Sequence, residues 1–270
     1  MSLVVFFLSW AIFSSLLSAF IGNKWLIILW IPLGYLAGLI CFLLFVVLML
    51  HFYFNKENRN PKVVVSFTKS TGYLINRLFF RIKTKVFGTE KIPKSGSAVC
   101  YGNHRSKLDA TIMLEVLNRP SGFTPKDTLY NIPVLRTWFN NMGSMKIYRQ
   151  NDRATTREMV KAIHRIKNGL MMIVYPEGTT RNHETNMMDE TKTGSYKLAL
   201  KSEADIVPFS VLGANKIKDN FPWRKTKVYV QFHDPIPFDV LKNMKTSEID
   251  DMVFEIINEG INELQDKYGE

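Results

Sequence analysis

Residues 170–182 read "LMMIVYPEGTTRN", a continuous apolar run that passes directly into a polar turn. An unbroken apolar run of this length, Leu170–Tyr175, is typical of a strand buried on both faces of a parallel sheet. In open α/β sheets, ligands bind outside the carboxyl ends of the strands. The turn places the Glu177 carboxylate, the Gly178 backbone and the Thr179 hydroxyl at such an end. A purely structural tight turn that uses the backbone freedom of Gly178 is the alternative.

Strands and helices are predicted to alternate on both sides of this run. This alternation predicts an α/β domain with a mostly parallel central sheet flanked by helices, over residues 87–270. The other predicted strands are Ser97–Tyr101, Ser144–Tyr148, Ile206–Leu212 and Lys227–Phe232, and the predicted helices are Ser106–Leu117, Ile132–Asn141, Asp152–Lys167, Ser195–Lys201 and Ser247–Gln265.

The first 52 residues are apolar enough to predict a transmembrane hairpin. No charged side chain precedes Lys24, and none lies between Lys24 and Lys56. The stretches Leu3–Ile21 and Trp25–His51 are each long enough to cross a bilayer as a helix, with a tight turn "GNK" between them. A cleaved signal peptide is the alternative for the first stretch, but it lacks a basic leading region and a second apolar stretch follows at once. Burial of both stretches in a soluble core is the remaining alternative.

Residues 53–86 form a basic segment in which Glu57 is the one acidic residue. Residues 63–86 predict an amphipathic helix at the membrane interface, and a core helix with a solvated basic face is an equal alternative. Basic flanks remain on the cytoplasmic side, so we expect a multi-pass protein of the cell membrane with its catalytic domain on the cytoplasmic face. The net charge of +11 could suggest nucleic acid, but a basic cluster next to a membrane span favours anionic lipid, and no nucleic-acid partner is expected.

A second polar turn, "YGNHRSKLD" at residues 101–109, follows a predicted strand and contains His104 and Asp109. Five positions along a helix differ by about 140° in direction, so the two side chains meet only if His104 lies in the turn before the helix. Ser106 is then the expected N-cap, with Asp109 at the third helical position of a capping box. A carboxylate in this place can also orient a catalytic imidazole. The spacing alone allows either role.

Together, "NHRSKLD" and "YPEGTTR" resemble the glycerolipid acyltransferases, the family of 1-acylglycerol-3-phosphate (lysophosphatidic acid) acyltransferases. The segment "KDTLYNIPVLRTWFNNMGSMKIYR" at residues 126–149 and "IVPFSVLG" at residues 206–213 are similar to the family's other blocks. Tyr175 replaces the family's usual Phe, and Arg136 stands where Gly is usual. Thr180 occupies the place of the family's Arg, with Arg181 one position later.

The resemblance implies transfer of an acyl group from a thioester to the free hydroxyl of lysophosphatidic acid. It implies His104 as general base and Asp109 as the residue that orients it. Lys126 and Arg149 would bind the acceptor phosphate, and the acceptor site would include Glu177, Gly178, Thr179 and Arg181. The donor would be a thioester of acyl carrier protein or of coenzyme A, and no cofactor is expected. The histidines and the two cysteines show no zinc-ligand spacing, so no metal is expected either.

Two alternatives remain open from the sequence. The same chemistry could use glycerol-3-phosphate or another lysophospholipid as acceptor, because the motifs barely separate these substrates. A non-catalytic, basic, membrane-tethered lipid-binding protein is the alternative from another functional class.

Overall fold

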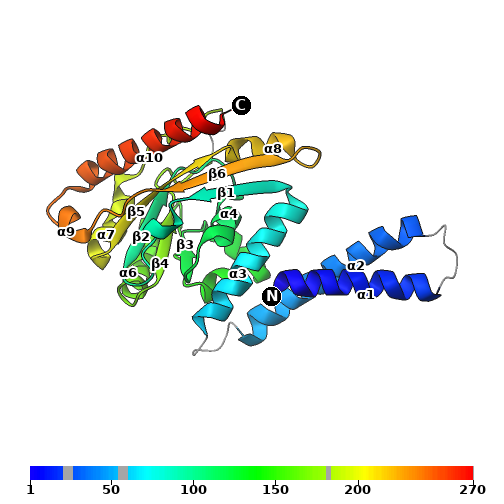
Figure 1. Cartoon of the computed structure of the whole chain (residues 1–270). Helices are drawn as coiled ribbons and strands as arrows, with labels where there is room; N and C mark the ends of the chain where they lie inside the picture. Colours follow the sequence, from blue (N-terminus) through cyan, green and yellow to red (C-terminus); the bar gives the residue numbers. More distant parts are fainter. Residues whose placement is uncertain (21–26, 54–59, 181–183, 270) are drawn as a thin grey trace.

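The computed structural model describes residues 1–20, 27–53, 60–180 and 184–269. It consists of a six-stranded sheet with helices on both faces and a pair of long N-terminal helices that extends away from the sheet (Figure 1). The predicted fold class is confirmed. The predicted "GNK" turn and Arg181 lie outside the described residues.

The strand order is β1-β6-β5-β2-β4-β3. Every neighbouring pair is parallel except β5 and β6, which run antiparallel. The strands are β1 (Ile82–Phe87), β2 (Ala98–Gly102), β3 (Ser121–Phe123), β4 (Met171–Val174), β5 (Asp205–Leu212) and β6 (Thr226–Phe232). The central strands β2 and β4 therefore end at the same edge of the sheet, and this brings the two polar turns together.

Strand β2 shows how the sheet separates two hydrophobic cores. Ala98 and Cys100 point into one core, and Val99 and Tyr101 point into the other, as the two-residue period of a strand requires. The helices that complete the fold are α3 (Pro61–Leu74), α4 (Asp109–Val116), α5 (Pro133–Asn141), α6 (Asp152–Lys167), α7 (Lys197–Ser202), α8 (Ile217–Asn220), α9 (Phe238–Leu241) and α10 (Thr246–Tyr268).

Helix α1 (Ser2–Phe20) packs along α2 (Ile27–Leu48), which continues through a π-helical turn, Met49–Tyr53. Phe6, Trp10 and Tyr35 form aromatic contacts between the two helices. By length and composition both helices could cross a membrane, over Ser2–Ala19 and Leu29–Tyr53. Only 11% and 28% of these windows are buried, whereas a core helix of a soluble protein would be mostly buried.

Polar and aromatic contacts join the base of this hairpin to α3. The Ser2 amide donates to Ser70 Oγ at 3.2 Å, and the hydroxyls of Ser2 and Thr71 lie 2.9 Å apart. The Phe45 ring meets the Phe67 ring in an edge-to-face arrangement. The hairpin is therefore fixed to the α/β domain through α3.

Residues 82–86 differ from the predicted helix over residues 63–86. They form most of β1, which crosses the expected boundary between residues 86 and 87. The apolar residues of α3, including Phe67 and Leu74, lie in the protein core, which matches the core-helix alternative for that face. The prediction of a helix over residues 82–86 failed because, in a segment this short, the spacing of apolar residues does not distinguish a strand from a helix.

The segment Ser144–Tyr148 was predicted as a strand, and this is wrong. Only Ile147 forms a bridge there, to Lys126. Met145 N donates to Phe123 O and Ile147 N donates to Pro125 O, so the segment continues alongside β3 without forming a regular strand.

Gly72 sets how closely α3 approaches α4. A Cβ at this position would lie 2.8 Å from Glu115 N and 2.9 Å from Thr111 O, both backbone atoms of α4.

We expect Gly72→Ala to lower the unfolding temperature of the detergent-solubilised protein. Overpacking costs about 1–3 kcal/mol and exceeds the roughly 0.5–1 kcal/mol that Ala gains in a helix. Ser66→Ala, on the exposed side of α3, is the control and should leave the temperature unchanged or raised. An equal rise in both variants would contradict the close approach.

Candidate active site

The turn that carries His104 is fixed to β5 by the residue before it. Asn103 is fully buried, and its Oδ1 accepts from Val211 N at 2.8 Å. Its Nδ2 donates to Val211 O and to Asn186 O, both at 2.8 Å. The backbone that enters the turn therefore has a fixed direction, and His104 projects from it with 22% of its side chain exposed.

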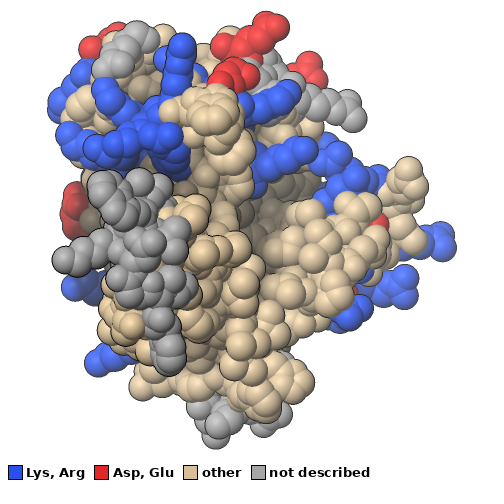
Figure 2. Space-filling model, turned by 90° about the vertical axis from the view of Figure 1, so that its right-hand side faces the viewer, with Lys and Arg blue, Asp and Glu red and all other residues tan. Residues whose placement is uncertain are grey.

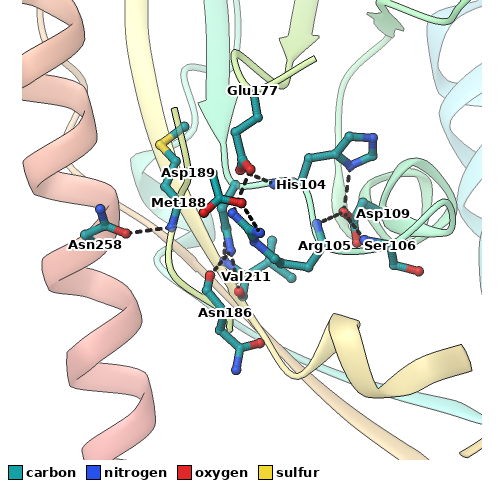
Figure 3. A network of polar contacts seen from close by, with 11 residues as sticks. His104, Arg105, Ser106, Asp109, Glu177, Asn186, Met188, Asp189, Val211 and Asn258 are labelled. Atoms are coloured by element: carbon teal, nitrogen blue, oxygen red, sulfur yellow. Dashed lines mark hydrogen bonds and ion pairs between the residues drawn. The ribbon is translucent and has the colours of Figure 1, made fainter. Parts of the chain in front are cut away.

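The Asp109 carboxylate collects three N–H donors on one oxygen. Its Oδ2 lies 2.8 Å from His104 Nδ1, and it accepts from the Arg105 amide at 2.8 Å and the Ser106 amide at 2.9 Å. The dashed lines of Figure 3 converge on this oxygen beneath the imidazole ring. Because an ionised carboxylate only accepts hydrogen bonds, this contact favours a proton on His104 Nδ1, and in the neutral imidazole Nε2 then keeps its lone pair.

Asp109 does not occupy the predicted capping-box position. Helix α4 begins at Asp109 itself, and the residue before it, Leu108, makes no side-chain cap. The Ser106 hydroxyl accepts from the Leu108 amide within a turn that precedes the helix. The helix therefore begins three residues after Ser106, the predicted N-cap. The bond that a capping box requires of the acid still forms, because Asp109 Oδ2 accepts from the Ser106 amide.

Glu177 joins the two polar turns through its two carboxylate oxygens. Its Oε1 accepts from the His104 amide at 2.8 Å, and its Oε2 accepts from Arg105 Nη2 at 2.6 Å. Arg105 Nη1 also pairs with Asp189 Oδ2 at 3.1 Å. Burial raises the pKa of Glu177, while the His104 amide and the Arg105 guanidinium act in the opposite direction. The Glu177 side chain is 2% exposed, and both of its carboxylate oxygens accept hydrogen bonds from the protein; its place in the acceptor site stays a prediction.

Tyr175 covers one face of the His104 imidazole. The two rings stack with centroids 4.3 Å apart and an interplanar angle of 16°. Burial raises the pKa of Tyr175, and the Asp109 carboxylate adds to the shift, so the phenol stays neutral. The stacked ring holds the plane of the imidazole, a task that the family's usual Phe could also perform.

Two exposed cations lie just beyond β3 and the segment alongside it: Lys126 on the chain that leaves β3, and Arg149 directly after Tyr148. Lys126 is positioned by its bridge to Ile147, and Arg149 Nη2 donates to Gly178 O at 2.8 Å. Gly178 has a φ of +65°, a conformation that favours glycine. The structure thus brings Arg149 to the turn that follows β4, and Thr179 is half-buried there.

Sequence reasoning missed Arg105, Asn103 and Asp189. Arg105 is 1% exposed, and a buried arginine in a turn full of polar residues cannot be told from a solvated one by spacing. Asn103 gave a weak signal, because it lies directly at the end of an apolar strand. Asp189 gave none, since it lies in an irregular loop that only the fold brings to Arg105.

Residues 83–212 match the family model described as Acyltransferase. This stretch of the chain is similar to that family. The resemblance found in the sequence is therefore confirmed, and the matched residues include both polar turns and the segment between them. In the part of the chain that the structure describes, no group of three or more His, Cys, Asp or Glu residues could hold a metal ion.

The chain is also similar to curated relatives and to a solved structure. A 1-acyl-sn-glycerol-3-phosphate acyltransferase of Borreliella burgdorferi is 32% identical over 164 residues, covering 60% of this chain and 64% of the relative. A relative of the same name from Salmonella typhimurium is 27% identical, covering 60% and 65%. The chain thus spans less than two thirds of these relatives' lengths. The crystal structure of PlsC, the 1-acyl-sn-glycerophosphate acyltransferase from Thermotoga maritima, matches with a TM-score of 0.67 and 25% identity, covering 82% of this chain and 87% of that one.

We expect Arg105→Met to destabilise the domain by about 3–5 kcal/mol, because Glu177 would remain as a buried charge without its cation. Lys107→Met, two residues away and exposed, is the control and should change the free energy of unfolding little. The double variant Arg105→Met/Glu177→Gln should recover part of the loss, since it removes the unpaired charge. Denaturant unfolding followed by fluorescence measures all three, and equal stability of the two single variants would contradict the role given to Arg105.

Proposed function

We propose that this protein is a membrane-bound 1-acylglycerol-3-phosphate O-acyltransferase. It moves a fatty acyl group from a thioester of acyl carrier protein or coenzyme A to the free hydroxyl of lysophosphatidic acid, giving phosphatidic acid. The observation that carries the proposal is the bond from His104 Nδ1 to Asp109, which leaves Nε2 as a base within an acyltransferase domain. The names of the relatives support the choice of acceptor.

The proposed reaction needs one base and no covalent enzyme intermediate. His104 Nε2 takes the proton of the acceptor hydroxyl while that oxygen attacks the thioester carbonyl carbon. The carbon–sulfur bond then breaks, and the proton passes from His104 to the departing sulfur. Asp109 stabilises the imidazolium that forms between these two transfers. A hydroxyl oxygen thus replaces sulfur on the acyl carbon, and His104 returns to its starting state.

Lys126 and Arg149 are the proposed partners of the acceptor phosphate. Both are exposed, and Arg149 is held against the turn after β4 by its bond to Gly178 O. Because that bond uses Nη2, other guanidinium donors of Arg149 remain for phosphate oxygens. The sequence motif adds Thr179 and Arg181 to this site. Glu177 contributes indirectly, since it holds the His104 amide and Arg105 in place.

The hairpin of α1 and α2 would place the domain at the membrane that contains the acceptor and the product. Their exposed apolar surfaces support two spans. Lysines and arginines flank the second span on the domain side, which supports a multi-pass protein with the domain on the cytoplasmic face. The acceptor would then reach His104 from the bilayer, and the soluble donor would reach it from the cytoplasm.

We expect His104→Ala to lower acyl transfer by on the order of 10²–10⁴-fold, the usual contribution of a general base. Asp109→Asn should lower kcat by a similar factor, because an amide can no longer enforce protonation at Nδ1. Both rates are measured with purified protein reconstituted in membranes, by following the transfer of the acyl group from an acyl thioester to labelled lysophosphatidate. Undiminished transfer by His104→Ala would reject the enzymatic assignment and favour the non-catalytic lipid-binding alternative.

Arg149→Ala should raise the KM for lysophosphatidate with a smaller effect on kcat, since a phosphate contact made in both ground and transition states is uniform binding. Arg157→Ala, an exposed arginine on α6, is the control and should leave the KM unchanged. A panel with glycerol-3-phosphate and other lysophospholipids identifies the acceptor. Preference for an acceptor without a phosphomonoester would contradict the role of Arg149.

A further inference from the structure

The loop between α8 and β6 exposes two large aromatic side chains. Trp223 is 83% exposed and Phe221 is 43% exposed. Tryptophan is highly buried in most proteins, so an almost fully exposed tryptophan next to an exposed phenylalanine suggests an interaction surface. Neither residue belongs to the acyltransferase motifs or touches His104 in the contacts that the structure describes.

Contacts on both sides hold this loop in a defined conformation. The Phe221 amide donates to Ile217 O at 3.0 Å, and the Arg224 amide donates to Asn220 O at 2.7 Å. Arg81 Nη1 donates to Pro222 O at 3.3 Å. The centroids of the Phe80 and Phe221 rings lie 5.2 Å apart. Trp223 therefore lies in a loop of defined conformation, with its side chain exposed to solvent.

Basic side chains surround the two aromatic residues. Arg224 and Lys225 follow Trp223 directly, and both are exposed. Ile82 of β1 pairs with Thr226 of β6, so the exposed Arg81 lies beside Lys225 at the same end of the sheet. Figure 2 shows lysines and arginines gathered on this face of the molecule above the tan hairpin. Such a surface matches anionic headgroups in charge.

The loop lies on the side of the domain from which the hairpin extends. Helix α3 binds the hairpin base through Ser70 and Thr71, and the chain then runs from α3 to Phe80 and Arg81, which contact the loop. In Figure 1 the connection after α8 projects from the sheet in the direction in which α1 and α2 extend. A membrane that contained the hairpin would therefore face this loop.

We propose that residues 221–225 form a second membrane contact, an interfacial anchor that binds the anionic lipid surface beside the hairpin. Trp223 and Phe221 enter the headgroup region, where aromatic residues are enriched, and Arg81, Arg224 and Lys225 bind lipid phosphates. The anchor rests on the membrane placement of the proposed function. With the hairpin, it gives the domain two attachment points and so limits its tilt relative to the bilayer.

A fluorescent label at residue 223 tests the anchor. Trp223→Cys is made in a Cys41→Ser background and labelled with bimane. Cys100 stays in place, because burial raises the pKa of its thiol to about 12 and leaves it unreactive. The control is Val160→Cys, which replaces a residue of α6 that is 62% exposed. Both full-length proteins are reconstituted into vesicles of phosphatidylcholine and phosphatidylglycerol with or without lipids that carry a quenching nitroxide near the headgroup.

We expect strong quenching of the label at residue 223 and little at residue 160. Replacing phosphatidylglycerol by phosphatidylcholine should reduce the quenching at 223. Arg224→Gln/Lys225→Gln should remove this dependence on lipid charge, while Arg153→Gln/Arg157→Gln, which changes exposed residues of α6, should not. Equal quenching at 223 and 160 would overturn the proposal. An unquenched label at 223 that responds to soluble acyl carrier protein would overturn it in favour of protein docking.

The acyl-transfer activity of the same labelled proteins is also measured in detergent micelles. This measurement distinguishes a failure of the anchor from a failure of the proposed function. Transfer that depends on His104, together with an unquenched label at 223, overturns the anchor and leaves the enzyme assignment standing. A quenched label in a protein without transfer activity supports the anchor and rejects the enzyme assignment.

Discussion

One carboxylate oxygen, Asp109 Oδ2, accepts hydrogen bonds from His104 Nδ1 and from the amides of Arg105 and Ser106. The two amides fix the oxygen, and the oxygen fixes the imidazole, so the orientation and the tautomer of His104 have one cause. Because Asp109 is 1% exposed, water does not compete for these bonds. The proposed chemistry depends on this arrangement, since a base in acyl transfer needs an unprotonated nitrogen directed at the acceptor.

The sheet explains why the two polar turns meet. Strands β2 and β4 are parallel neighbours, so the turn with His104 and the turn with Glu177 begin at the same edge. Glu177 then binds the His104 amide and Arg105, and Asn103 ties the same turn to β5 on the other side. Three adjacent strands therefore support the turn that carries His104, and this support explains how a loop residue can be held in a fixed position.

The alternation of apolar runs with amphipathic helices predicted the sheet, the order of most elements and the meeting of the two polar turns at one edge, while the pairing of His104 with Asp109 came from the resemblance. These features depend on local periodicity and on the rule that parallel strands end at one edge. The start of α4, the strand β1 and the lack of a strand at Ser144–Tyr148 were not predicted, because each depends on which backbone donor or neighbouring strand competes for a segment. Arg105 and Asp189 are far apart in sequence, and only the tertiary fold shows that they pair.

The tautomer of His104 is the most direct test of this account. Long-range ¹H–¹⁵N correlation spectra of ¹⁵N-histidine-labelled protein in nanodiscs report which ring nitrogen carries the proton, and a His104→Gln spectrum assigns the signal. The account predicts a protonated Nδ1 and an unprotonated Nε2 at neutral pH, with this preference lost in Asp109→Asn. A protonated Nε2 with a bare Nδ1 in the unsubstituted protein would contradict it.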